Sequence, residues 1–191
     1  MTATLIPSVP IVSIECKEPE GTVIRHVYPM LLSMDNLRTF WEKASQFRTL
    51  FTDDINGDFN KFCELFISAD AAGVRAHGLF WVVDDFVGVF YVNFIRETEA
   101  LCHYTFFDRR HFGREELTKA MLRYVFTRYG FQRLNVEVAA YASKHTFGFT
   151  HALGFVKEGR KRKCLLYKGD WFDVHQYGLL REEALKDAPE N

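Results

Sequence analysis

The chain has 191 residues, and 48% of them are apolar, so a single domain with a sizeable buried core is expected. The formal net charge of −1 argues against binding through bulk positive charge, and we expect no nucleic-acid partner. The four cysteines show no CxxC spacing, which predicts no metal site and is typical of a reducing, cytoplasmic setting. No apolar run reaches ~18 residues, the length of a membrane-spanning helix, so no membrane association is expected.

The N-terminal part predicts an arm, a strand and two helices. Residues 1–21 are rich in proline and predict an irregular arm, and Thr22–Tyr28 before Pro29 predicts the first strand of a domain over residues 22–183. Ser33 suits a helix N-cap, and apolar residues at helical spacing predict a helix over residues 34–48. A second apolar helical face follows the break at residues 56–58. Both helices are aromatic on one side, so we expect them to pack on a sheet.

The middle of the chain predicts an antiparallel meander. Residues 79–83 and 87–95 are rich in strand-forming residues on either side of the polar pair Asp84–Asp85, which indicates a hairpin. Residues 100–107 predict a third strand. Both faces of these strands are largely apolar, so the sheet is expected to be covered on both sides.

The C-terminal part alternates strands and helices. A basic turn over residues 108–114 precedes a predicted helix over 115–129, which Gly130 ends. A strand over 134–138, a helix over 143–153 and strands over 155–159, 164–167 and 171–180 follow. The end from Arg181 is polar and is expected to fray, with residues 184–191 as a tail.

Two stretches point to a known family. The first is the loop RHFGRE, Arg110–Glu115, and the second is the ending LGFVKEGR, Leu153–Arg160, followed by GDWFD and YGLL. Together with the order of elements they resemble the GCN5-related N-acetyltransferase (GNAT) superfamily, and the ending resembles its ribosomal-protein N-terminal acetyltransferase branch. The resemblance spans roughly residues 22–183. It implies an α/β (α+β) fold with a mixed, mostly antiparallel sheet flanked by about four helices.

The resemblance also implies acetyl-CoA as the cosubstrate. Backbone N–H groups at a helix N-terminus bind phosphate, and a glycine there, Gly113, lets the backbone approach closely. Arginines supply further positive charge for a pyrophosphate, although a solvated basic turn explains them equally well. The residues expected to bind the cosubstrate, with the preceding strand edge at the pantetheine arm, are Phe106, Phe107, Arg109, Arg110, Gly113, Arg114, Ser143 and Thr146.

The resemblance implies direct attack of a primary amine on the thioester, the amine belonging to a protein N-terminus, a peptide or a small molecule. Glu137 matches the general-base position of some members, and a solvent-facing strand residue is the alternative. His103 is a second candidate base because its ordinary pKa suits neutral pH, the alternative being a satisfied, half-buried histidine. Tyr141 is a candidate donor to the leaving thiolate, or a structural tyrosine. The assembly is expected to be a monomer or a homodimer.

Three positions depart from the family pattern. Glu115 stands where a small residue is usual and places a carboxylate beside the pyrophosphate loop. Ala142 or Ser143 replaces the usual asparagine, and Phe149–Thr150 stands where many members have a tyrosine that protonates the thiolate. These departures leave a second interpretation open, in which the chain is a catalytically inactive GNAT-fold protein that acts as a binding or structural module.

Overall fold

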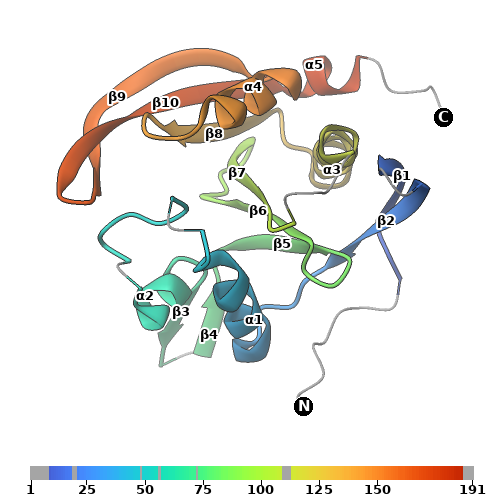
Figure 1. Ribbon diagram of the computed structural model, residues 1–191. Helices are drawn as coiled ribbons and strands as arrows, with labels where there is room; N and C mark the ends of the chain where they lie inside the picture. The colour runs from blue at the N-terminus through green and yellow to red at the C-terminus, as the bar shows by residue number, and fades with distance from the viewer. Residues whose placement is uncertain are drawn as a thin grey trace.

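The computed structural model describes residues 9–18, 21–47, 49–55, 57–71, 73–108 and 113–186. Its main element is an eight-stranded sheet in the order β1-β2-β5-β6-β7-β8-β10-β9, with a separate two-stranded sheet β3-β4 (Figure 1). The strands are β1 Val12–Glu18, β2 Gly21–Pro29, β3 Ile67–Asp70, β4 Gly73–Ala76, β5 Gly78–Val83, β6 Gly88–Asn93, β7 Glu99–Phe106, β8 Arg133–Ala139, β9 Val156–Tyr167 and β10 Asp170–Leu180. The helices are α1 Met34–Ala44, α2 Phe59–Glu64, α3 Arg114–Tyr129, α4 Lys144–Ala152 and α5 Arg181–Leu185.

One strand pair differs from all others among the described strands. Neighbouring strands pair antiparallel except β7 and β8, which run parallel and pair only from Glu99 opposite Arg133 to Leu101 opposite Asn135. Both strands continue beyond these positions, to Phe106 and Ala139. The sheet therefore opens between the C-terminal ends of β7 and β8. The expected mixed, mostly antiparallel sheet flanked by helices is confirmed.

Helices cover both faces of the sheet, as the apolar character of the meander predicts. On the front face, defined here as the side of α1 and α2, aromatic rings from both helices pack on β5 and β6. Phe62 is fully buried, and its ring lies 4.9 Å from that of Phe66, which in turn contacts Tyr91. On the back face, α3 and α4 pack against the second large cluster, which includes Leu134 and Val136 of β8. Most of the aromatic residues thus fill the core.

The expected helix ends follow from local hydrogen bonds. The Ser33 hydroxyl accepts the backbone N–H of Asn36 at 3.2 Å, and the Asp58 carboxylate accepts the N–H of Asn60 at 2.8 Å. These side chains satisfy donors that a helix leaves free at its start. Gly130 ends α3 in the left-handed conformation, with φ at 73°, which glycine adopts without strain. The helix predicted over residues 34–48 ends earlier, at Ala44.

Two terminal segments correct the sequence prediction. Part of the expected irregular arm forms β1, which pairs with β2 from Val12 opposite Val27 onward, and its Cys16 is buried beside α3. Tertiary contact with α3 stabilises a strand that the proline content concealed. The segment after Arg181, expected to fray, begins as α5. There the Glu183 carboxylate accepts the Leu180 N–H at 2.8 Å, and the Arg181 guanidinium donates to the Phe126 carbonyl.

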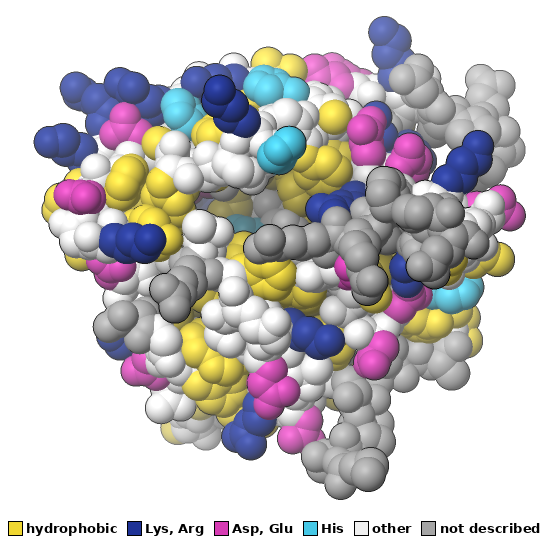
Figure 2. Space-filling model, viewed as in Figure 1, with side chains coloured by type: hydrophobic (Ala, Val, Ile, Leu, Met, Phe, Trp, Pro, Cys, Tyr) yellow, Lys and Arg dark blue, Asp and Glu magenta, His cyan; other side chains and the backbone are white. Residues whose placement is uncertain are grey.

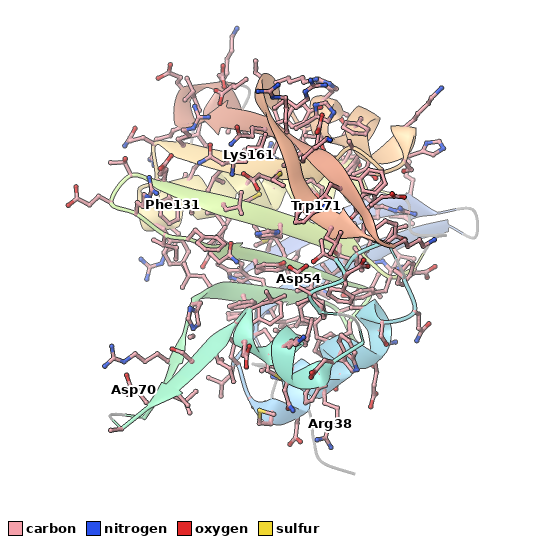
Figure 3. All side chains as sticks on the ribbon, turned by 90° about the vertical axis from the view of Figure 1, so that its left-hand side faces the viewer. Arg38, Asp54, Asp70, Phe131, Lys161 and Trp171 are labelled. Carbon is pink, nitrogen blue, oxygen red and sulfur yellow. The ribbon has the colours of Figure 1, made fainter. Side chains whose placement is uncertain are left out.

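The β9–β10 hairpin is fixed to the loop that follows α1. The Asp53 carboxylate accepts the backbone N–H groups of Lys168 and Gly169, both at 2.8 Å. Figure 3 shows the end of this hairpin beside the loop that carries Asp54. This contact joins the last strand of the sheet to the layer of α1 and α2. No helix in the described part of the chain has the length and apolar character that crossing a membrane requires.

Candidate active site

A cavity of about 650 Å³, here called the cofactor cavity, lies between the end of β7 and the starts of α3 and α4. Figure 2 shows a hollow in the surface below the layer that contains α4. Apolar and polar groups both contribute to the cavity lining. The lining residues include Tyr104, Phe106, Arg114, Glu115, Ser143, Lys144, His145, Thr146 and Phe149. Five positions from this list, namely Phe106, Arg114, Glu115, Ser143 and Thr146, stand out in the sequence, and the fold brings them together.

The N-terminus of α3 lies at this cavity, where Arg114 and Glu115 contribute to the lining. Its N-cap is Gly113, which has φ at 76° and provides no side-chain cap, so the first-turn N–H groups have no capping acceptor from it. A Cβ at Gly113 would lie 2.6 Å from the Cys16 sulfur, so a side chain does not fit. The Arg114 guanidinium lies 5.9 Å from the centre of the Phe106 ring. The backbone N–H groups of the first turn, the positive end of a sixteen-residue helix dipole and an arginine fit a pyrophosphate.

The Glu115 carboxylate is compensated. Glu115 lines the cofactor cavity. Its Oε1 accepts a hydrogen bond from Lys119 Nζ at 2.7 Å, one helical turn further on. The pair is formally neutral, so the anionic charge at this edge of the cavity is balanced.

The start of α4 and the side chain of Tyr104 form the polar part of the cavity. Ser143 is the N-cap of α4, and its hydroxyl accepts the Thr146 N–H at 3.2 Å. Tyr104 reaches from β7 across to α4, where its hydroxyl lies 2.9 Å from that of Thr150. Burial raises the pKa of the Tyr104 phenol, which therefore stays protonated at neutral pH. Sequence reasoning missed Tyr104, although its alternation with Phe106 on one strand was a usable signal.

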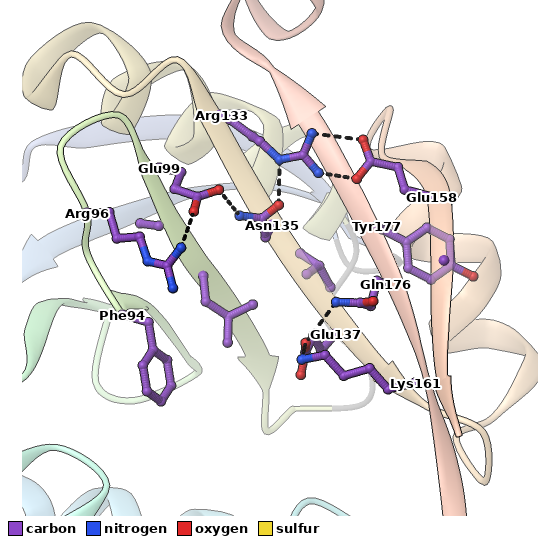
Figure 4. A pocket seen from close by; sticks show the side chains of 14 residues that line it. Phe94, Arg96, Glu99, Arg133, Asn135, Glu137, Glu158, Lys161, Gln176 and Tyr177 are labelled. Carbon is purple, nitrogen blue, oxygen red and sulfur yellow. Dashed lines mark hydrogen bonds and ion pairs between the residues drawn. The ribbon is translucent and has the colours of Figure 1, made fainter. Parts of the chain in front are cut away.

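A second cavity of about 630 Å³, here called the front cavity, lies on the side of the sheet that faces α1 and α2 (Figure 4). Glu137 lies on β8 beyond its last pair with β7, where the sheet opens. Its carboxylate accepts hydrogen bonds from Lys161 of β9 and from Gln176 of β10, the latter at 3.4 Å. These partners follow from strand register, because Gln176 lies opposite Glu137. The candidate base thus faces a cavity.

The far end of the front cavity lies where β7 and β8 pair. The Glu99 carboxylate accepts from Arg96 at 3.2 Å and from the Asn135 amide at 3.2 Å. Arg133 donates to Asn135 at 2.7 Å and makes a two-pronged ion pair with Glu158. Through this ion pair, each partner shifts the pKa of the other, raising that of Arg133 and lowering that of Glu158. Figure 4 shows these groups meeting across three strands.

Two candidate catalytic residues, His103 and Tyr141, lie away from both cavities. His103 is buried against Tyr91 at a ring distance of 4.3 Å, and its Nε2 lies 3.0 Å from the Asn93 amide oxygen. Burial lowers the pKa of His103 to about 4, so the ring is neutral at neutral pH, which favours the structural alternative. Tyr141 stacks on Tyr167 at 4.2 Å, and burial raises its pKa.

Phe107 packs with the front cluster beside Phe40 and not in the cofactor cavity. Arg109 and Arg110 lie outside the described residues. Within the described part of the chain, no group of three or more His, Cys, Asp or Glu side chains has the arrangement of a metal site.

Comparison with known proteins places this geometry in context. Residues 59–176 match the sequence model of the family described as "Acetyltransferase (GNAT) domain". The SPbeta prophage-derived uncharacterized N-acetyltransferase YokL of Bacillus subtilis (strain 168) is 32% identical over 69 residues. That match covers 36% of this chain and 38% of the relative, so the chain spans well under half of its length.

Several solved structures share the fold. Mycobacterium smegmatis RimJ in complex with CoA-disulfide superposes with a TM-score of 0.64 at 17% identity, covering 97% of this chain and 92% of RimJ. A dodecameric spermidine N-acetyltransferase from Vibrio cholerae gives 0.60 at 18% identity, covering 86% and 98%. The ribosomal-protein-S5-alanine acetyltransferase from Vibrio fischeri gives 0.59 at 15% identity, covering 90% and 98%.

Proposed function

Because the chain belongs to the GNAT family of acetyltransferases, we propose that it transfers an acetyl group from acetyl-CoA to a primary amine by direct attack. The observation that carries the proposal is the position of two cavities at the opening between β7 and β8. The cofactor cavity lies at the starts of α3 and α4, and the front cavity holds Glu137 on the side of α1 and α2. A cosubstrate and an acceptor can thus approach the same gap from different directions.

The cofactor cavity fits acetyl-CoA, which supplies an acyl group activated as a thioester. The backbone N–H groups in the first turn of α3 and the Arg114 guanidinium would hold the pyrophosphate through charge-assisted hydrogen bonds. Phe106 and Phe149 offer an apolar wall for the pantetheine arm, and Ser143 and Thr146 offer hydroxyl groups. The Glu115 carboxylate alone would repel a pyrophosphate bound here, and its ion pair with Lys119 offsets this repulsion.

Glu137 acts as the proton acceptor in this proposal. The amine nitrogen forms a bond with the acyl carbon while the carbon–sulfur bond breaks, and the Glu137 carboxylate takes the proton that the nitrogen loses. Tyr104 donates a hydrogen bond to the leaving sulfur, because its phenol stays protonated and lines the cofactor cavity. It would serve in place of the tyrosine that the sequence lacks at Phe149–Thr150.

The inactive binding module is the competing function, and acetyl-CoA titration separates the two. Calorimetry should show acetyl-CoA binding, and Arg114→Ala should weaken it about tenfold or more, the value of a charge-assisted hydrogen bond. Absence of binding at millimolar acetyl-CoA would exclude the enzyme. If binding occurs, Glu137→Gln should lower kcat by about 100-fold or more with little change in acetyl-CoA affinity. Glu97→Gln, in an exposed turn, is the matched control.

A further inference from the structure

Thr150 is a buried polar residue of α4 that lies directly behind Tyr104. None of its surface is exposed, and it does not line the cofactor cavity, whereas Tyr104 does. Its Oγ1 lies 2.9 Å from the Tyr104 hydroxyl and 3.0 Å from the Thr146 carbonyl oxygen. A buried hydroxyl is costly unless it makes hydrogen bonds, so these two contacts fix the position of the Thr150 side chain.

The two hydroxyl groups can share their protons in two ways, because each has only one to donate. If Thr150 donates to the Thr146 carbonyl, its oxygen accepts the Tyr104 proton, which then points away from the cavity. If Thr150 instead donates to the Tyr104 oxygen, the Tyr104 proton is free to point into the cavity. The change requires only rotation of the two O–H bonds. Thr150 therefore controls the direction in which Tyr104 donates.

Charge in the cavity decides between the two arrangements. In the free protein the first is favoured, because both protons have an acceptor. A sulfur that gains negative charge reverses the preference, since a hydrogen bond to an ionised acceptor is about twice as strong as one between neutral groups. The second arrangement then gives a chain from Thr150 through Tyr104 to the sulfur. Each hydrogen bond of such a chain polarises and strengthens the next.

The surroundings hold the Tyr104 phenol where this exchange can occur. Its ring packs edge-on against that of Phe149, with 5.4 Å between the ring centres, and its backbone is paired with Phe90 of β6. Burial raises the pKa of the phenol, and the hydrogen bond with Thr150 partly opposes this rise. A hydrogen bond that lowers the pKa of a phenol stabilises negative charge on its oxygen, as a donor does.

We propose that Thr150 is a positioning residue for the acetyl transfer, an inference that rests on the proposed function. It accepts the Tyr104 proton in the free protein and turns its own hydroxyl to the Tyr104 oxygen as the carbon–sulfur bond breaks. Neither hydroxyl loses its proton, and the sulfur leaves as the thiolate. Thr150 stands where many GNAT members have a tyrosine, so two side chains, one from α4 and one from β7, take the place of that one.

Binding of free CoA tests this inference without an acceptor, because the CoA thiolate stands in for the leaving sulfur. At about pH 9 most of the thiol is ionised, since the pKa of a thiol is about 8.5. Calorimetry should show that Thr150→Val weakens CoA binding about three- to tenfold, the value of one hydrogen bond, and leaves acetyl-CoA binding unchanged. Thr150→Ser, which keeps a hydroxyl, should bind both ligands as the wild type does.

Steady-state kinetics test the same role during turnover, with a short alanine-terminated peptide and spermidine as acceptors. Thr150→Val should lower kcat about three- to tenfold and leave the KM for acetyl-CoA unchanged. In Tyr104→Phe, which has no phenolic oxygen, Thr150→Val should lower kcat no further. The matched control is Thr118→Val, which should not change kcat. Thr118 is 1% exposed on α3, and its hydroxyl has no hydrogen-bond partner within the described residues.

The outcomes separate this inference from the proposed function. If acetyl-CoA and CoA bind but Thr150→Val leaves CoA affinity unchanged, the role of Thr150 is refuted and the acetyltransferase proposal stands. The same holds if Thr150→Val slows Tyr104→Phe as much as it slows the wild type, because the loss is then a packing defect. If neither ligand binds the wild type, the acetyltransferase proposal fails and the role of Thr150 fails with it.

Discussion

His103 should make the free energy of unfolding depend on pH. Its pKa is lowered from 6.5 to about 4 by burial, so between these values the unfolded chain binds more protons than the native protein. Stability therefore falls as the pH falls from neutrality toward 4. From these two pKa values, His103 contributes a loss of about 2 kcal/mol between pH 7 and pH 5 and about 3 kcal/mol below pH 4.

His103→Gln removes this titration, so urea unfolding should be measured for both proteins at several pH values between 7 and 5. The free energy of the wild type should fall by about 2 kcal/mol more than that of the variant, whatever the variant loses at pH 7. His77→Gln, at an exposed position, is the control. If the free energy of unfolding depends on pH equally in the wild type and in His103→Gln, protonating the His103 ring does not destabilise the native protein. The reasoning from burial would then be wrong.

Further substitutions test the cofactor cavity and the hairpin contact. Gly113→Ala should lower the free energy of unfolding by about 2 kcal/mol and weaken acetyl-CoA binding, because Gly113 has a positive φ and an added Cβ would meet Cys16. Gly148→Ala is the control and should not lower the free energy of unfolding, because its Cβ would face open space. Tyr104→Phe should lower kcat about tenfold or more while leaving acetyl-CoA affinity unchanged. Asp53→Ala should cost about 1–3 kcal/mol and speed amide hydrogen exchange at Lys168 and Gly169, since both N–H groups lose their acceptor. Calorimetry checks the outcome for Gly113→Ala, steady-state kinetics that for Tyr104→Phe, and hydrogen exchange that for Asp53→Ala. In each case an unchanged value would contradict the contact that the substitution alters.

Local chemistry predicted most elements of the fold. Caps at Ser33 and Asp58, the glycine after α3 and the apolar periodicity of the helices act within a few residues, so the sequence alone reveals them. The strand β1 and the helix α5 were missed because tertiary contacts stabilise them, through β2 and α3 for the strand and through Phe126 for the helix. The β3–β4 hairpin was also missed, because its two short strands show no sequence pattern strong enough to predict them.

The residues of the candidate site also fall into two groups, those that the sequence alone predicts and those that only the tertiary structure brings together. The sequence alone determined the position of Gly113 before α3 and the strand that carries Glu137, because both follow from local pattern. Only the tertiary structure showed that Tyr104 reaches Thr150 and that Glu99 shares a cavity with Glu137. Each of these pairings depends on helix geometry or strand register, since residues far apart in the chain meet only when β7, β8 and α4 come together.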